Sequence, residues 1–324
     1  MKFTNKKLLS LLLVLTLLLS FTGCGSKEEV TKDSDTEASV VETQKDQAIA
    51  LPSEDRAGNA ITIPDNIDSI ISLAPSITET LVELGVADKL VAIDTNSVGR
   101  EGVANDLPTF DLMNPDVEKM AALNPSIIFV SSISLIDGQD PFAPLKELGI
   151  CIVCIPTSNS IKAIEEDIDF LGKVTQNTAK SDEIIATMQS EIDQIAAIGK
   201  TITDKKSVYF EIAAAPSMYS FGSGVFLNEM IELIGATNVF KDEESWISVE
   251  AENAVNANPD VILTNVNYIE NPCEEILERE GFEKVTAVKE GQVYYIDNMS
   301  SSLPNENIVK ALKEMAEAVY PDLY

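Results

Sequence analysis

The feature that most constrains the fold is an alternation of short apolar segments with helical patterns, which the sequence runs through twice. The first set predicts buried strands at residues 69–73, 89–93, 127–130 and 151–155, with helices at 77–84, 116–123 and 141–148. The second set predicts strands at 207–212, 261–264 and 293–296, with helices at 225–234, 251–256, 273–279 and 305–319. Strands that alternate with helices favour a parallel sheet. We therefore expect an α/β protein of two Rossmann-like lobes, each with its own parallel sheet.

A helical pattern of unusual length separates the two sets. Between Ser160 and Lys200 there is no proline, and apolar residues recur at the three- and four-residue spacing of a helix. We expect one long helix here, with a break or kink allowed near residues 175–178, that joins the lobes rigidly. The predicted organisation is then a first lobe at 51–160, a connecting helix at 161–200 and a second lobe at 201–324.

The first 23 residues have the pattern of an export signal. A basic start precedes an apolar run at residues 8–19, and such a helix would rise only about 18 Å, too little for a hydrocarbon core of ~30 Å. The Gly23-Cys24 pair that follows resembles a bacterial lipobox, whose cysteine receives lipid; the alternative is a plain secretory signal. Residues 24–50, rich in Ser, Thr, Lys, Asp and Glu, predict a flexible acidic tether. We expect an extracytoplasmic protein that a lipid on Cys24 anchors to the cell membrane.

Charge and the absence of histidine exclude several classes of function. A formal net charge of -30 repels phosphates and disfavours nucleic acid as a partner. The chain has no histidine, which excludes a Ser-His-Asp triad, a Cys-His dyad, and zinc or haem ligated by histidine. Because the commonest general base is missing, the sequence weighs against an enzyme in general. We expect a binding protein with no catalytic residues, no metal ligands and no cofactor.

The segment Cys151-Ile152-Val153-Cys154 has the spacing of a redox pair, but it lies in a β-branched run. Redox pairs of this spacing begin a helix, whereas residues three apart in a strand point to opposite faces. We therefore expect two buried free thiols.

One motif occurs once in each set. Glu118 and Glu252 each precede, by seven residues, the proline of an Asn-Pro pair that leads into a predicted strand. Two similar lobes would place these glutamates at related points. The alternative is a pair of ordinary helix-to-strand connections.

Four segments together resemble one protein family. Residues 70–79, with the sequence IISLAPSITE, and residues 84–92, 117–130 and 246–264 look like successive motifs of the binding proteins for iron-siderophores and cobalamin. The resemblance extends over residues 61–320. It implies two α/β lobes joined by a rigid long helix, with the ligand in the cleft between the lobes. It also implies a monomer that serves an ABC importer and delivers a metal chelate or corrinoid to a membrane permease and its ATPase.

Several residues are candidates for the cleft. Family members carry aromatic residues before each glutamate motif, and Phe110 and Trp246 hold such places here. A flat aromatic face suits a corrin, porphyrin or catecholate, although a lone tryptophan is often simply buried. Tyr219 and Phe221 follow a predicted strand, where open α/β sheets bind ligands. Ser76 follows the first strand, and it either belongs to a ligand-binding helix N-terminus or only caps that helix.

The same resemblance assigns a different role to Glu118 and Glu252. In the family, a surface acid on each lobe meets arginines of the permease, and these two glutamates match those positions. Opposite charges of this kind steer docking and fix its register. In so acidic a chain, a solvated helix acid is the alternative for each of them.

The expected function is thus the capture of a metal-containing organic ligand outside the cell. Ferric siderophores and cobalamin are the leading ligands, and haem ranks behind them because its axial ligation would need Met or Tyr here. Two other functions stay open: a secreted hydrolase that uses two carboxylates, and a surface lipoprotein that senses a ligand without a permease.

Overall fold

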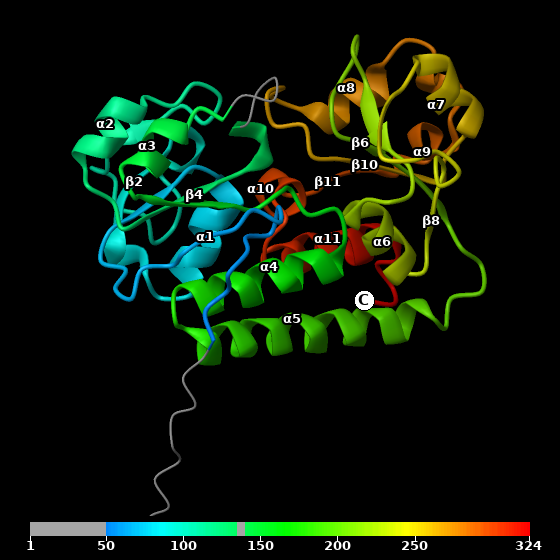
Figure 1. Cartoon of the computed structure of the whole chain (residues 1–324). Helices are drawn as coiled ribbons and strands as arrows, with labels where there is room; N and C mark the ends of the chain where they lie inside the picture. The colour runs from blue at the N-terminus through cyan, green and yellow to red at the C-terminus, as the bar shows by residue number, and fades with distance from the viewer. Residues whose placement is uncertain (1–49, 135–139) are drawn as a thin grey trace, which may run out of the picture. The chain divides into compact units, whose positions relative to one another are not determined.

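The computed structural model describes residues 50–134 and 140–324 (Figure 1). Residues 1–49, which include the predicted signal sequence, Cys24 and most of the predicted tether, lie outside the described residues. None of the helices in the described part of the chain is long and apolar enough to span a membrane.

The first lobe is built on a five-stranded parallel sheet. Its strands are β1 (Ile70–Ser72), β2 (Leu90–Asp94), β3 (Thr109–Phe110), β4 (Ile127–Val130) and β5 (Cys151–Cys154). They lie in the order β3-β2-β1-β4-β5, and every neighbouring pair is parallel. The helices of this lobe are α1 (Pro75–Glu83), α2 (Val117–Ala122) and α3 (Ala143–Glu147). All of these elements except the short edge strand β3 were predicted from the sequence.

The second lobe has a four-stranded parallel sheet in the order β11-β10-β6-β8. Its strands are β6 (Ser207–Glu211), β8 (Thr237–Asn238), β10 (Val261–Thr264) and β11 (Val293–Tyr295). A separate antiparallel ribbon is formed by β7 (Tyr219–Phe221) and β9 (Trp246–Ser248). The helices are α6 (Phe226–Leu233), α7 (Ala251–Ala257), α8 (Pro272–Glu278), α9 (Thr286–Lys289), α10 (Asn298–Ser302) and α11 (Ile308–Val319). The predicted α/β class with two parallel sheets is confirmed.

The connecting segment is broken at residues 175–177, where the sequence allowed a break, but it is not the single long helix that we expected. It forms two helices, α4 (Ile161–Val174) and α5 (Thr178–Gly199), which pack against each other (Figure 1). The first helix ends because Gln176 takes a left-handed φ of 60°, and the Asn177 N–H donates to the Gly172 carbonyl at 2.7 Å. Gly172 also lets the second helix approach, since a Cβ on it would lie 2.1 Å from Ser181 Oγ. The prediction is therefore corrected to a hairpin whose second helix is long.

One hydrophobic core, called the central core below, contains side chains from both sheets. Ile127 and Phe129 of β4 point into it, as do Val208 and Phe210 of β6. Helices α4, α5, α6 and α11 add further side chains, among them Ile168, Met188, Met230 and Leu312. The intervening strand residues point the other way, into one outer core in each lobe. Both sheets are therefore covered on both faces, as parallel sheets usually are.

The two cysteines of β5 occupy different cores. Cys151 points into the central core and Cys154 into the outer core of the first lobe, and both are free and buried. Burial raises the pKa of each thiol to about 11, so neither forms a thiolate at neutral pH. The prediction of buried thiols on opposite faces is confirmed.

The motif that the sequence repeats has the same conformation in both lobes. Helices α2 and α7 are each followed by a left-handed asparagine, Asn124 with a φ of 47° and Asn258 with a φ of 45°. A proline and then a parallel strand come next, β4 in one lobe and β10 in the other. The two lobes therefore share this connection in structure as well as in sequence.

Candidate functional site

The strand orders locate where each sheet should bind a ligand. The order reverses between β1 and β4 in the first lobe and between β6 and β10 in the second. In open α/β sheets, ligands bind outside the carboxyl ends of the strands at such a reversal. Segments that leave these ends are therefore the candidates for the site.

Exposed apolar side chains gather in the segments at these carboxyl ends. Eight of the eleven large apolar residues that are exposed in the described part of the chain lie there: Val98, Met113 and Ile133 in the first lobe, and Tyr219, Trp246, Tyr268, Tyr295 and Met299 in the second. Single exposed apolar residues need no explanation, but their concentration at one edge of each sheet indicates a binding surface.

Three rings form what we call the aromatic wall: Tyr219, Trp246 and Tyr268. Phe221 pairs with Trp246 across the β7–β9 ribbon, and Tyr219 is two residues from Phe221 on the same strand. The side chains of Tyr219, Phe221 and Trp246 therefore lie on one face of the ribbon. Tyr219 is 44% and Trp246 45% exposed. The hydroxyl of Tyr268 accepts a hydrogen bond from the Ala214 N–H at 2.8 Å, which ties its exposed ring to the segment before β7.

The aromatic wall rests on buried side chains. The ring of Phe221 meets Trp246 edge-to-face with centroids 5.9 Å apart, and it meets Phe210 of the central core at 5.6 Å. Below the ribbon, Glu211 at the end of β6 accepts two hydrogen bonds of 2.7 Å from Arg279, which follows α8. The exposed ring of Trp246 is therefore supported from the central core through Phe221, while the Glu211–Arg279 pair fixes the end of β6.

The sequence-predicted cleft residues separate into exposed and buried ones. Trp246 and Tyr219 are exposed as expected, but Phe221 is fully buried and Phe110 is 6% exposed within the outer core of the first lobe. Phe110 points into the outer core from the end of β3, whereas Phe221 is buried because its ring packs between those of Phe210 and Trp246, so neither offers a face to a ligand in this conformation. Tyr268, Met113 and Ile133 hold exposed places instead. Tyr268 and Ile133 come just after predicted buried strands, which was the signal for them, whereas Met113 follows β3, a strand that the sequence did not predict.

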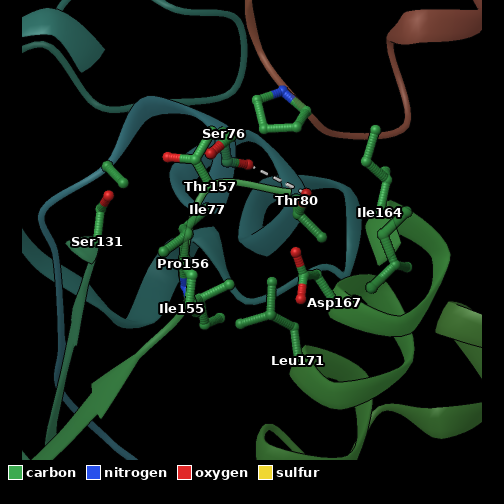
Figure 2. A pocket seen from close by; sticks show the side chains of 13 residues that line it. Ser76, Ile77, Thr80, Ser131, Ile155, Pro156, Thr157, Ile164, Asp167 and Leu171 are labelled. Atoms are coloured by element: carbon green, nitrogen blue, oxygen red, sulfur yellow. Dashed lines mark hydrogen bonds between the residues drawn. The ribbon is translucent and has the colours of Figure 1, made fainter. Parts of the chain in front are cut away.

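Ser76 does not cap a helix. Helix α1 begins at Pro75, whose fixed φ suits the first helical position, so Ser76 lies inside the first turn. Its side chain lines a small cavity of about 30 Å³ with Ser131, Thr157 and Asp167 of the first lobe and hairpin, and with Pro304 (Figure 2). The cavity has room for about one water molecule. Burial raises the pKa of Asp167, which nonetheless pairs with Arg56 at 2.6 Å.

Polar contacts join the lobes beside a larger cavity of about 270 Å³ between α1 and α10–α11. Glu306 accepts a hydrogen bond of 2.8 Å from the hydroxyl of Thr80, and Asn305 Nδ2 donates to Glu79 at 2.6 Å. Arg100 pairs with the other oxygen of Glu79. Withdrawal from water raises the pKa of Glu306 to about 7; Glu79 and the neighbouring Glu83 add to the rise, and the Thr80 hydroxyl opposes it.

The two glutamates expected to dock on a permease are both exposed. Each is the second residue of its helix, Glu118 in α2 and Glu252 in α7. Acidic side chains are favourable there because the helix N-terminus carries partial positive charge. In the described residues, no group of three or more Asp, Glu or Cys side chains converges to hold a metal ion.

Comparison with known proteins identifies the class. The family described as "Periplasmic binding protein" matches residues 70–299, and the chain belongs to it. This family comprises substrate-binding proteins rather than enzymes, which removes the hydrolase alternative.

Individual relatives narrow the class further. YvrC of Bacillus subtilis, an ABC transporter substrate-binding lipoprotein, is 29% identical over 304 residues, covering 93% of each chain. A cobalamin-binding protein of Halobacterium salinarum is 24% identical over 293 residues, covering 85% of this chain and 76% of that one. The structure of a possible iron-binding protein from Staphylococcus epidermidis matches with a TM-score of 0.70 at 27% identity, covering 78% of this chain and 99% of the other. Proteins named for haem and molybdate binding also match. The chain is a substrate-binding protein of an ABC transporter.

The raised pKa of Glu306 predicts that its contribution to stability falls as the pH rises. The unfolded carboxyl has an ordinary pKa of 4.5, so between pH 4.5 and about 7 the folded state holds the additional proton. The contribution is complete below pH 4.5 and is lost as the pH rises through 7. The side chain of Glu306→Gln cannot ionise. At pH 8 the free energy of unfolding of this variant should therefore exceed that of the wild type by about 1 kcal/mol, a value reduced because the carboxyl is partly hydrated.

Urea denaturation at pH 5 and pH 8 measures this difference. The exposed Glu283→Gln is the matched control, and it should follow the wild type at both pH values. An unchanged pH dependence in Glu306→Gln would contradict the assignment of the proton to this carboxyl.

Proposed function

We propose that the protein captures a metal-containing organic ligand, either a ferric siderophore or cobalamin, and delivers it to the membrane permease of its transporter. The observation that carries the proposal is the aromatic wall, whose exposed rings stand on a rigid support at the carboxyl edge of the sheet. Flat rings favour contact with the planar parts of a chelate or corrin. The relatives named for cobalamin and iron support the same class of ligand.

An intact chelate also suits the side chains that are available. The metal in such a ligand already has its donors, so the protein needs no histidine, and the chain has none. Haem ranks behind because axial ligation would fall to Met or Tyr. A surface lipoprotein without a permease remains a second candidate, and adjacent permease and ATPase genes would decide against it.

Replacing Trp246 tests the ligand-binding role. Trp246→Ala should weaken binding of the ligand by about tenfold or more, because a desolvated aromatic contact is worth about 1 kcal/mol beyond its buried area. Trp246→Phe keeps a flat ring and should lose much less. Isothermal titration of the wild type and both variants with a panel of ferric siderophores, cobalamin and haem measures the effect.

Thermal unfolding of the same variants provides the control. Trp246 is 45% exposed, so the alanine variant should keep nearly the wild-type midpoint. Loss of stability with unchanged affinity would assign Trp246 to the core and defeat the proposed role.

We also propose that Glu118 and Glu252 meet arginines of the permease. They are exposed, they hold equivalent positions in α2 and α7, and they belong to different lobes. Two contacts to one permease reinforce each other, because each raises the effective concentration of the second. Losing one glutamate should therefore weaken transport less than losing both.

Charge reversal gives the clearest expected outcome for docking. Glu118→Lys and Glu252→Lys should each reduce uptake of labelled ligand by cells, and the double variant should reduce it further than either single variant, while ligand affinity of the purified proteins stays unchanged. The control is the double variant Glu183→Lys/Glu317→Lys, whose sites are exposed on α5 and α11. It changes the net charge by the same amount and should leave uptake intact. Wild-type uptake in the Glu118/Glu252 double variant would end the docking proposal.

The membrane anchor is proposed to be a lipid on Cys24, which the relation to a lipoprotein supports. Cys24→Ala should move the protein from the membrane fraction to the medium, because a cleaved signal without lipid leaves no attachment. Fractionation with radiolabelled palmitate measures both events. Unchanged membrane retention and the absence of label in the wild type would contradict it.

A further inference from the structure

The chain has three arginines, and internal ion pairs engage all of them. Arg56 lies between Glu166 and Asp167 at 3.0 and 2.6 Å. Arg100 pairs with Glu79, and Arg279 pairs with Glu211 and Glu275. Arginine is the side chain best suited to carboxylates and oxyanions, since its planar fork donates two parallel hydrogen bonds.

Burial keeps two of these guanidinium groups away from a ligand. The side chains of Arg100 and Arg279 are 9% and 8% exposed. Arg56 keeps more contact with solvent, but both of its carboxylate partners lie on α4. Breaking any of these pairs to bind an anion would leave a carboxylate without its partner, which is strongly unfavourable in the buried cases.

The surroundings of the aromatic wall are acidic. The exposed run Lys241-Asp242-Glu243-Glu244 ends two residues before Trp246, and Glu270 lies two residues after Tyr268. Within the described parts of the segments after the first-lobe strands, residues 95–116, 131–134 and 140–142 contain five acidic residues and Arg100 as their one cation. Charges of one sign along a concave surface focus the field and change the local concentration of ionic ligands.

We infer that the ligand surface at the aromatic wall excludes oxyanions and anionic chelates, and accepts ligands that are neutral or positively charged. The inference rests on the proposed ligand-binding role of this wall, and it narrows the ligand class by charge. Two independent observations carry it: every arginine is engaged within the protein, and exposed acidic residues lie next to Trp246 and Tyr268 along the chain. Acidic side chains repel a negatively charged ligand and so lower its affinity relative to a neutral or positively charged one.

Collisional quenching of Trp246 tests the field without any ligand. Trp246 is the one tryptophan of the whole sequence, so fluorescence reports on the aromatic wall alone. The quenching constant of each ion is measured at constant low ionic strength and divided by its quenching constant for N-acetyltryptophanamide. The normalised constant for caesium should exceed that for iodide by about twofold or more. The variant Asp242→Asn/Glu243→Gln/Glu244→Gln should bring the two normalised constants together.

A second triple variant with the same net charge separates the effect of the acids beside Trp246 from the effect of the net charge of the whole protein. Asp182→Asn/Asp193→Asn/Glu317→Gln removes three exposed charges from α5 and α11, and it should leave the caesium preference intact. Iodide quenching equal to or stronger than caesium quenching in the wild type would overturn the inference. Titration of molybdate and sulfate into the purified protein is a second test. We expect no binding of either oxyanion, and micromolar affinity for either would overturn the inference. Neither measurement uses a metal chelate. The outcome for this inference is therefore independent of whether the protein binds a ferric siderophore or cobalamin.

Discussion

The central core is the interaction on which the rest of the structure depends. It contains strand residues of both sheets together with α4, α5, α6 and α11, so the two lobes do not have separate interiors on this side. Moving the lobes apart would expose apolar side chains such as Phe210 and Met188, at about 25 cal/mol for each Å². The aromatic wall, which we propose as the ligand surface, would accordingly be a surface that is already formed before the ligand arrives.

Rigidity and ligand choice have a common source in how the chain uses its few arginines. Arg279 holds Glu211 at the end of β6, and Arg100 holds Glu79 beside the contacts between lobes. Each pair fixes a carboxylate where water is scarce, and removing one partner would leave a buried charge. The same engagement leaves no guanidinium for a ligand, so the pairs that stabilise the scaffold also restrict what the scaffold binds.

Much of the fold was predictable because its strands are buried on both faces. Continuous apolar runs such as 127–130 and 261–264 matched β4 and β10 residue for residue. The hairpin was not predicted as two packed helices, because its turn depends on a left-handed Gln176 and on space above Gly172. The β7–β9 ribbon pairs segments far apart in sequence, and the burial of Phe221 beneath Trp246 follows from that pairing alone. The resemblance to the family identified Trp246, whereas Tyr268 needed the strand end that precedes it.

The repeated helix–Asn–Pro–strand connection relates the two proposed roles of the protein in space. A helix that leads into a parallel strand runs antiparallel to it, so α2 and α7 both begin toward the carboxyl edge of their sheets. Glu118 and Glu252 lie in the first turns of these helices, and the exposed apolar residues gather at the same edges. A permease that engages both glutamates would thus cover the edge at which we propose that the ligand binds. Docking and ligand transfer would then share one face, which explains why two lobes with the same connection suit a protein that must present its ligand to a single partner.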